Sequence, residues 1–194
     1  MPQHVCPWWI GLALASPLRR VFYTPRNVLE PYVRDGMLVL EPGPGMGFFT
    51  LELALLVGNS GKVIAVDLQK EMLDRLRHRA RKKGISDRID IRLADANGLH
   101  IDDLAGRVDF VLAFAMVHEV PDKKRFFSDM LSTLRPEGRL LISEPAWHVR
   151  DADFRITLDT ALGVGFRLHS TPIIKTNLSA LLFRNWPQML QQTP

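Results

Sequence analysis

Two kinds of apolar pattern alternate along the chain. Short apolar runs predict strands at residues 37–41, 62–67, 89–96, 107–114 and 138–145. Segments with apolar residues every three or four positions predict helices at residues 48–57, 70–83, 122–134 and 151–163. Because strands and helices alternate, we expect a doubly wound, Rossmann-like α/β fold, with a mostly parallel sheet and helices on both faces.

The ends of the chain add smaller elements to this pattern. Thr24 and Pro25 are typical of a helix start and predict a short helix over residues 23–29. Two final runs, 166–175 and 178–183, predict an antiparallel hairpin. The helix over 151–163 is expected to pack on the core through one apolar stripe, which consists of Phe154, Leu158, Ala161 and Leu162.

The composition fits one globular domain. The chain has 194 residues, 46% hydrophobic and 24% charged, which is enough for a sizeable core. A net charge of +4 favours an anionic substrate, but the basic residues form no clustered stripe of the kind that binds nucleic acid. Those of segment 70–83 spread around an amphipathic helix, which favours a solvated face over an RNA-binding patch. The single cysteine, Cys6, excludes an internal disulfide and indicates a reducing, cytoplasmic setting.

The stretch 5–18 is apolar enough to raise the question of a signal peptide or membrane anchor. It lacks a basic start, contains two prolines and is too short to span a bilayer, so no transmembrane segment is expected. We expect segment 1–21 to pack on the domain or to cover the active site. Contact of Trp8 and Trp9 with a membrane interface is the alternative.

A glycine-rich stretch follows the first predicted strand. Residues 43–47 alternate glycine with other residues and predict a tight turn into a helix, where glycine permits unusual backbone angles and a close approach of a ligand. A dinucleotide fingerprint is disfavoured because Phe48 stands where it needs glycine or alanine. A P-loop is disfavoured because Val63 follows Gly61 and Lys62.

This stretch, Glu41-x-Gly43-x-Gly45-x-Gly47, resembles the first motif of the class I S-adenosylmethionine-dependent methyltransferases. The segment 134–138, Leu-Arg-Pro-Glu-Gly, resembles the turn and strand after the fourth motif of that family. The resemblance covers residues 22–186, leaves 187–194 as a tail, and implies the family's seven strands with the last one antiparallel. The closest group is the small-molecule methyltransferases, which include quinone-biosynthesis enzymes.

The resemblance also implies where the cofactor binds. In the family the glycine turn lies along the amino-acid end of S-adenosylmethionine. Asp67, which ends a predicted strand, is expected to accept hydrogen bonds from the ribose hydroxyls, unless it only caps the next helix. Asp95 is expected to accept from the adenine amino group, while the amide of Ala96 meets the ring. The implied cofactor-binding residues are Glu41, Gly43, Pro44, Gly45, Gly47, Asp67, Leu68, Asp95, Ala96 and Phe114.

The stretch 115–120 resembles the fourth motif of the family, which faces both the methyl donor and the acceptor. His118 and Glu119 form a titratable pair there and are the candidate catalytic residues, which would position the acceptor or remove a proton. A pair that only bonds the backbone at a helix start is the alternative. Tyr23 and Arg26 are weaker candidates for covering the cofactor, unless they lie on a plain surface helix.

The resemblance implies direct, in-line transfer of a methyl group from S-adenosylmethionine to a nucleophilic atom of a small-molecule acceptor. Methylation of RNA or protein and a non-catalytic S-adenosylmethionine-binding subunit are the alternatives. An arsenite-type activity is disfavoured because it depends on several cysteines and only Cys6 is present. Since the chain has no inserted lid, we expect an acceptor site that is shallow, covered by segment 1–21 or completed in a homodimer.

Overall fold

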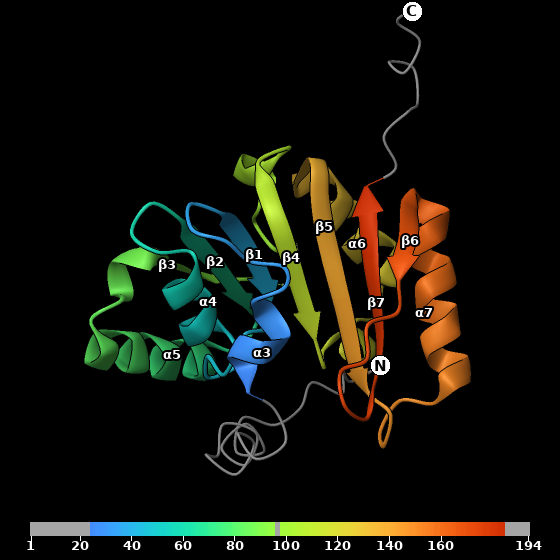
Figure 1. The fold of residues 1–194 in the computed structure, drawn as a ribbon, viewed down its shortest axis with the longest axis horizontal. Helices are drawn as coiled ribbons and strands as arrows, with labels where there is room; N and C mark the ends of the chain where they lie inside the picture. Colours follow the sequence, from blue (N-terminus) through green and yellow to red (C-terminus); the bar gives the residue numbers. More distant parts are fainter. Residues whose placement is uncertain (1–23, 96–97, 185–194) are drawn as a thin grey trace, which may run out of the picture.

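The computed structural model describes residues 24–95 and 98–184. These residues form a central sheet with helices on both of its faces (Figure 1). The strands are β1 (Leu38–Pro42), β2 (Lys62–Asp67), β3 (Ile89–Leu93), β4 (Val108–Phe114), β5 (Leu134–Pro145), β6 (Phe166–Ser170) and β7 (Asn177–Arg184). The α-helices are α3 (Pro25–Leu29), α4 (Thr50–Leu56), α5 (Lys70–Lys83), α6 (Lys123–Thr133) and α7 (Asp151–Val164). Short 3-10 turns are η1 (Ser86–Arg88), η2 (Asp102–Leu104) and η3 (Val117–Glu119).

The sheet has seven strands in the order β3-β2-β1-β4-β5-β7-β6. Strands β1 to β5 pair in parallel, whereas β7 runs antiparallel to both β5 and β6. The chain moves outward from β1 to β3 and then returns to the other side of β1 with β4, so the strand order reverses between β1 and β4. Ligands of such sheets bind at that reversal, outside the carboxyl ends of the strands. The expected doubly wound sheet with an antiparallel last strand is confirmed.

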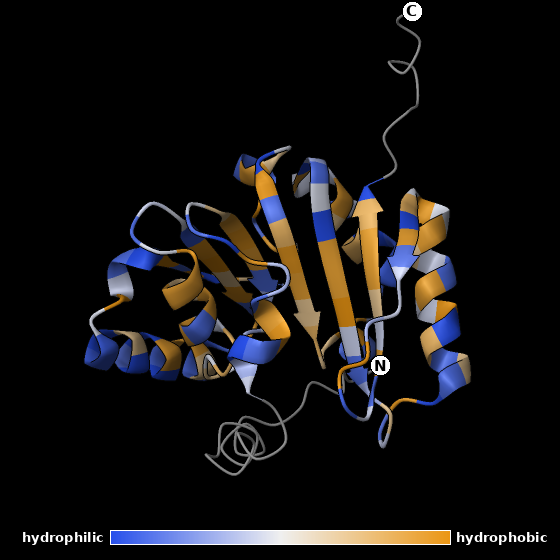
Figure 2. Ribbon diagram, in the orientation of Figure 1, coloured by the Kyte–Doolittle hydropathy of each residue, from blue (hydrophilic) through white to orange (hydrophobic). Residues whose placement is uncertain are grey.

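Two hydrophobic clusters lie on opposite faces of the sheet. In β4, Phe110 and Leu112 belong to one cluster, while Val111 and Ala113 belong to the other, as the alternation of side chains along a strand requires. Helices α3, α4 and α5 cover the first cluster, and α6 and α7 cover the second. Both faces of the strands are therefore buried, and Figure 2 shows the central strands as mostly hydrophobic.

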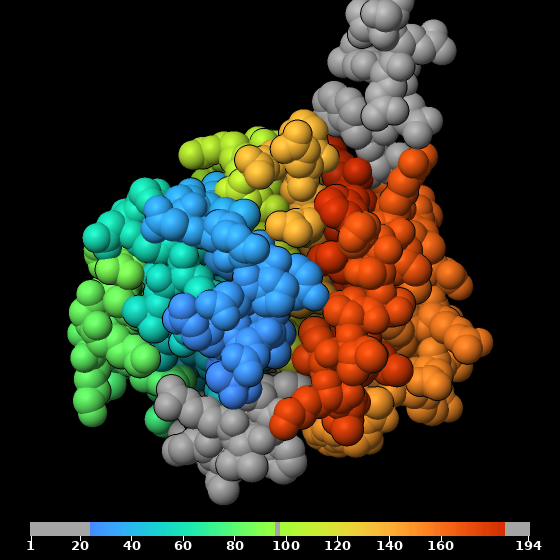
Figure 3. All heavy atoms as spheres, in the orientation of Figure 1, coloured from blue at the N-terminus to red at the C-terminus, as the bar shows by residue number. Residues whose placement is uncertain are grey.

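The segment after α3 lies across the face of the sheet that carries α4 and α5. The ring of Tyr32 stacks on Phe110 of β4 with ring centroids 5.7 Å apart, and the Tyr32 carbonyl accepts a hydrogen bond from Arg139 of β5 at 3.2 Å. Figure 3 shows this part of the chain, in blue, over the middle of that face, beside the red and orange C-terminal elements. Thr24 precedes α3 at the N-cap position, although its side chain makes no capping hydrogen bond.

Some element boundaries differ from the pattern-based expectation. The helix expected from residue 48 begins at Thr50, and the strands expected to reach residues 96 and 175 end at Leu93 and Ser170. The expectation that Leu162 faces the core is wrong, because its exposed fraction is 37%. Thr157 is buried instead. Its hydroxyl can be buried because it donates a hydrogen bond to the Asp153 carbonyl at 3.0 Å.

The expected N-terminal segment 1–21, with Trp8 and Trp9, lies outside the described residues, as does the tail 187–194. Within the described part of the chain, none of the helices has the length and apolar character needed to cross a membrane.

Candidate active site

The carboxyl ends of β1, β2, β4 and β5 meet at one edge of the sheet. The glycine turn follows β1, Asp67 ends β2, the 115–119 turn follows β4, and Glu144 lies near the end of β5. Because these strands are parallel neighbours, residues far apart in the sequence come together here.

The glycine turn adopts backbone angles that favour glycine. The φ angles are +67° at Gly43, +54° at Gly45 and +83° at Gly47. A Cβ at Gly47 would lie 2.4 Å from Cδ1 of Leu76, so this glycine lets α5 pack closely on the turn. A Cβ at Gly45 would meet no atom within 4 Å. The turn therefore presents an open side at Gly45, where a ligand can approach the backbone.

Asp67 is held directly on this turn. Its Oδ2 accepts a hydrogen bond from the Gly45 amide at 3.2 Å, and its Oδ1 accepts one from the Gln69 amide at 2.9 Å. Burial raises the pKa of the Asp67 carboxyl, and these backbone donors oppose the shift. The next residue, Leu68, is half-exposed. The structure thus brings Asp67 to the glycine turn, as expected from its place at the end of a strand.

Glu41 lies at the end of β1 and is only 4% exposed. Its Oε2 has no hydrogen-bond partner among the described residues. Burial raises the pKa of the Glu41 carboxyl to about 8, the Thr50 hydroxyl lowers it in part, and the charge of Asp67 raises it further. A buried carboxyl oxygen without a partner, next to an open glycine turn, leaves a hydrogen-bond position for a ligand.

Asp95 lies beyond the end of β3, beside Asp67. The Ala94 amide donates to the Asp67 carbonyl at 2.9 Å, which ties the two strand ends together. The Asp95 carboxylate accepts from the Gly98 amide at 3.2 Å and pairs with His100 Nε2 at 3.0 Å. Ala96, the other expected adenine contact, lies outside the described residues.

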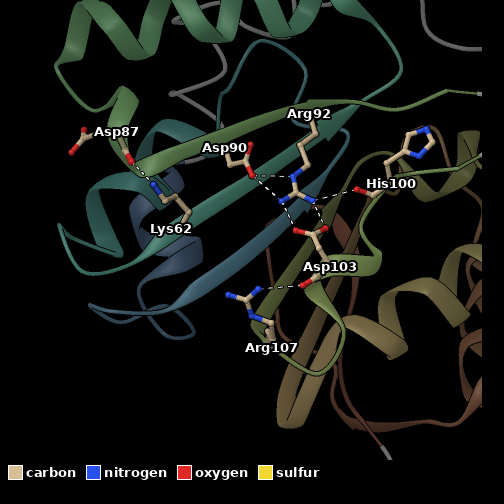
Figure 4. A network of polar contacts seen from close by, with 7 residues as sticks. All are labelled: Lys62, Asp87, Asp90, Arg92, His100, Asp103 and Arg107. Carbon is tan, nitrogen blue, oxygen red and sulfur yellow. Dashed lines mark hydrogen bonds and ion pairs between the residues drawn. The ribbon is translucent and has the colours of Figure 1, made fainter.

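The loop after Asp95 is anchored to β3 by one arginine. Arg92 binds Asp103 with both terminal nitrogens, at 2.6 and 2.8 Å, and donates to the His100 carbonyl at 3.2 Å (Figure 4). Its Nε also donates to Asp90 of the same strand at 2.9 Å. The position of His100 beside Asp95 is therefore set by contacts to the edge strand.

The other expected cofactor residues lie deeper in the molecule. Pro44 is buried in the turn. Phe114 ends β4, is 9% exposed, and packs on Phe49 with ring centroids 4.3 Å apart. Of the two weaker candidates, Tyr23 lies outside the described residues, and Arg26 is an exposed residue of α3 that pairs with Glu30 at 3.2 Å and Glu52 at 3.4 Å.

His118 lies in η3, directly after β4, and its main partner is Glu144 of β5. The Nδ1 of His118 is 2.7 Å from Glu144 Oε2, while Glu144 Oε1 accepts from the backbone amides of Val117 at 2.7 Å and His118 at 3.2 Å. Glu119 is more distant, with its Oε1 3.8 Å from His118 Nε2. Burial lowers the pKa of His118, but the hydrogen bond and charge of Glu144 outweigh it and raise the pKa above 6.5.

Glu144 was not among the residues expected from the sequence. It is 1% exposed and ends an apolar run, just as Asp67 does. The rule that singles out Asp67, an acid at the carboxyl end of a buried strand, would also have found Glu144.

A cavity of about 340 Å³ lies beside His118. It is bounded by η3, the start of α6, the end of β5 and α7, and its lining residues are His118, Lys123, Glu144, His148, Val149, Asp153, Ile156 and Thr157. Glu119 is not part of this lining. Within residues 24–95 and 98–184, no three histidine, cysteine, aspartate or glutamate side chains are grouped so that they could hold a metal ion.

The comparisons with known proteins agree with this arrangement. The family model for a methyltransferase domain matches residues 33–176, and the chain belongs to this family of class I S-adenosylmethionine-dependent methyltransferases. A solved structure of an S-adenosylmethionine-dependent methyltransferase from Aquifex aeolicus is similar in fold, with a TM-score of 0.81 and 23% identity over 92% of this chain and 98% of that one. A second one, from Methanococcus maripaludis, has a TM-score of 0.76 and 12% identity over 98% and 100%.

Curated relatives are similar over a little more than half of the chain. An arsenite methyltransferase from Halobacterium salinarum is 35% identical over 109 residues, which is 56% of this chain and 27% of the relative. The ubiquinone/menaquinone biosynthesis C-methyltransferase UbiE from Idiomarina loihiensis is 37% identical over 112 residues, 58% of this chain and 44% of the relative. The matches thus cover less than half of the length of these relatives.

Proposed function

We propose that this protein transfers a methyl group from S-adenosylmethionine to a nucleophilic atom of a small-molecule acceptor by direct in-line displacement. The main support for this proposal is the hydrogen bond from the Gly45 amide to Asp67 Oδ2, at 3.2 Å, which holds Asp67 on the open glycine turn. A carboxylate fixed at that point retains acceptor capacity for the hydroxyls of a ribose.

The cofactor site proposed here consists of Glu41, Gly43, Pro44, Gly45, Gly47, Asp67, Leu68, Asp95, Ala96 and Phe114. When bound, S-adenosylmethionine supplies a methyl group on a positively charged sulfur. The unpartnered Oε2 of the Glu41 carboxyl leaves a hydrogen-bond position for such a ligand, and the Cβ-free side of Gly45 gives room for its approach. The residues of the chain orient the two reactants and exclude water, which can supply several kcal/mol of rate enhancement.

On the acceptor side, His118 and Glu119 are the proposed catalytic residues. His118 lies beside the cavity and is held there by Glu144. Its neutral imidazole can accept a proton from an acceptor that arrives protonated. The Glu119 carboxylate, 3.8 Å from Nε2, favours the protonated imidazole that results.

A small-molecule acceptor is supported by the cavity, whose volume of about 340 Å³ lies within the range of small-ligand pockets. Two relatives, an arsenite methyltransferase and a ubiquinone/menaquinone biosynthesis C-methyltransferase, also favour a small-molecule acceptor. Within α5, the basic side chain of Arg77 and that of Lys70 both pair with Asp74 at 2.6 Å, as on a solvated helix face. We place the enzyme in the cytoplasm, and a homodimer is the proposed means of covering a shallow acceptor site.

The proposal is tested by calorimetric titration of the protein with S-adenosylmethionine. We expect Asp67→Asn to weaken binding by about 1 to 3 kcal/mol, because a charged hydrogen-bond acceptor is lost. The matched control is Asp74→Asn on the exposed face of α5, which should bind like the wild type. Equal affinity of both variants would remove Asp67 from the cofactor site.

Turnover is tested separately by measuring release of S-adenosylhomocysteine with pools of small molecules, RNA and protein. Release with small molecules alone supports the proposal. Release only with RNA or protein would establish one of the alternative acceptors. Cofactor binding without release from any pool would establish a non-catalytic subunit.

A further inference from the structure

The cavity beside His118 combines a basic nitrogen, a cation and an apolar wall. His118 and Glu144 come from the carboxyl ends of β4 and β5, Lys123 begins α6, and Val149 and Ile156 come from the segment around the start of α7. None of these side chains except His118 was singled out by the sequence. Their chemistry indicates which class of acceptor the cavity can take.

The hydrogen bonds of Glu144 determine which nitrogen of His118 carries a proton. Both oxygens of this buried carboxylate accept: Oε1 from two backbone amides and Oε2 from His118 Nδ1 at 2.7 Å. The neutral imidazole is therefore protonated on Nδ1, and Nε2 carries the lone pair. Within the described residues no hydrogen bond to Nε2 is formed, since Glu119 lies at 3.8 Å.

The charged groups around His118 are compensated to different degrees. The negative charge of Glu144 is stabilised by its three hydrogen bonds, and Asp153 of α7 pairs with Arg150 at 2.8 Å. Among the described residues, the hydrogen bond of the Lys123 ammonium goes to the Val120 carbonyl, at 3.3 Å. Its ammonium is thus the cation that faces the cavity, and an anion formed near His118 would be stabilised by it. The titratable and charged groups facing His118 are Glu119, Lys123, Glu144, His148 and Asp153.

The rest of the lining is mixed, with Val149 and Ile156 as its apolar side chains. His148 meets the His118 ring edge-on, with centroids 4.9 Å apart, and the ring of Trp147, which is not part of the lining, lies 5.4 Å from His148. Ile156 is 61% exposed and Trp147 76%, so an apolar ring bound in the cavity can cover Ile156 and extend toward Trp147.

The turn that carries His118 also touches the proposed cofactor turn. A Cβ at Gly43 would be 3.1 Å from Cβ of Met116, which is two residues before His118. The glycine turn and the His118 turn therefore touch each other, as transfer between two bound molecules requires.

We propose that this cavity binds the methyl acceptor, that the acceptor is a flat phenol or enol with an acidic hydroxyl, and that His118 Nε2 removes the hydroxyl proton. Lys123 binds the resulting oxyanion, and Glu144 is a positioning residue that holds the His118 tautomer. This inference rests on the proposed methyl transfer. The acceptor oxygen gives its proton to Nε2 and forms a bond to the methyl carbon, while the carbon–sulfur bond breaks and its electron pair stays on sulfur. The products are a methyl ether, a neutral thioether and an imidazolium.

The test uses the full chain with S-adenosylmethionine and matched probes: 1-naphthol, 1-naphthylamine and 1-naphthalenethiol, with 1-methoxynaphthalene as the blank. Release of S-adenosylhomocysteine is measured from pH 5 to pH 9. We expect turnover of 1-naphthol, with a rate that falls as the pH drops, because His118 must be neutral to accept the proton. Turnover of the amine or the thiol in preference to 1-naphthol would overturn the proposed acceptor class.

Variants separate the roles of the three residues. His118→Gln should lower kcat for 1-naphthol by about a hundredfold, as for loss of a general base. Glu144→Gln keeps the shape of the side chain and should move the acid limb of the pH profile to lower pH, because it removes the charge that raises the pKa of His118. Lys123→Met should lower kcat/KM by about tenfold, while Lys124→Met, at an exposed position of α6, should not.

The outcomes distinguish this inference from the proposed function. An unchanged acid limb in Glu144→Gln, or wild-type kcat in His118→Gln, would overturn the inference alone if S-adenosylmethionine is still bound and consumed with another acceptor. Failure to bind S-adenosylmethionine at all would overturn the proposed function as well.

Discussion

The carboxyl ends of β1 and β5 each hold a buried acidic side chain, but in opposite ways. At the end of β1, Glu41 is 4% exposed and its Oε2 has no partner among the described residues. Near the end of β5, Glu144 is 1% exposed and accepts hydrogen bonds from the backbone of Val117 and His118 and from the His118 ring. Both oxygens of Glu144 therefore have hydrogen-bond partners within the protein, whereas Oε2 of Glu41 has none among the described residues.

This difference indicates that the proposed cofactor side and the proposed acceptor side of the site are built from different kinds of groups. The proposed cofactor half consists of backbone amides, glycine conformations and a buried carboxyl group with one unpartnered oxygen. The proposed acceptor half consists of side chains that support each other across β4 and β5. We expect ligand binding to change the electrostatics of the first half more than those of the second.

The largest effect is expected at Glu41, whose protonation should make the free energy of unfolding depend on pH. Its pKa is raised from 4.5 to about 8 by burial, so the folded state retains a proton that the unfolded state loses. The resulting stability is fully present below pH 4.5 and is lost as the pH rises toward 8. Relative to Glu41→Gln, the wild type should lose up to about 5 kcal/mol of unfolding free energy over this range.

Urea unfolding of both proteins at a series of pH values measures this loss. The exposed Glu137→Gln is the matched control and should follow the wild-type pH profile. Parallel profiles for the wild type and Glu41→Gln would show that the Glu41 carboxyl is not held in a strained state, and the contrast with Glu144 would disappear.

A smaller effect is expected from two glycines that occupy one turn for different reasons. Gly47→Ala should cost about 2 to 3 kcal/mol of unfolding free energy, because its Cβ would meet Leu76 at 2.4 Å in addition to the unfavourable φ. Gly45→Ala should cost only about 1 kcal/mol but weaken S-adenosylmethionine binding by about tenfold, since its Cβ would fill the open side of the turn.

Thermal unfolding and calorimetric titration of the two variants compare these costs. If Gly45→Ala binds the cofactor like the wild type, the open side of the turn is not where the cofactor lies. Equal losses of stability in both variants would indicate that φ alone, and not the packing of α5, decides the role of Gly47.

The smallest effect is expected at Arg92, which anchors the loop beside Asp95. Arg92→Met removes its ion pairs with Asp90 and Asp103, but Asp103 is 55% exposed, so the loss should stay below about 1 kcal/mol. The change in cofactor affinity should be less than about threefold. Chemical denaturation and titration at low and high salt measure it. A loss above 2 kcal/mol would contradict a minor role for this network.

The parts of this molecule that follow local rules could be predicted from the sequence. The bounds of β2 and α5 match the expected 62–67 and 70–83, because Gly61 and Gly84 mark clear ends for these patterns. The meeting of Asp67 with the glycine turn also follows from strand order, since β1 and β2 are neighbours.

What the sequence did not predict depends on distant residues. His118 and Glu144 are 26 positions apart and meet only because β4 and β5 pair in parallel. In α7, Thr157 is buried where the pattern predicts Leu162. The hydrogen bond that satisfies the Thr157 hydroxyl cannot be predicted from the spacing of apolar residues. Adjacency in the sequence pairs His118 with Glu119, whereas in the structure the nearer carboxylate to the His118 ring is that of Glu144.

The close approach of Gly43 to Met116 bears on attempts to engineer the proposed site. Any side chain introduced at Gly43 would press on Met116 at about 3.1 Å and shift the turn that carries His118. Changes intended to alter cofactor preference would therefore also disturb the choice of acceptor. Ile156, on the exposed rim of the cavity and on another element, is a better starting point for altering the acceptor range alone.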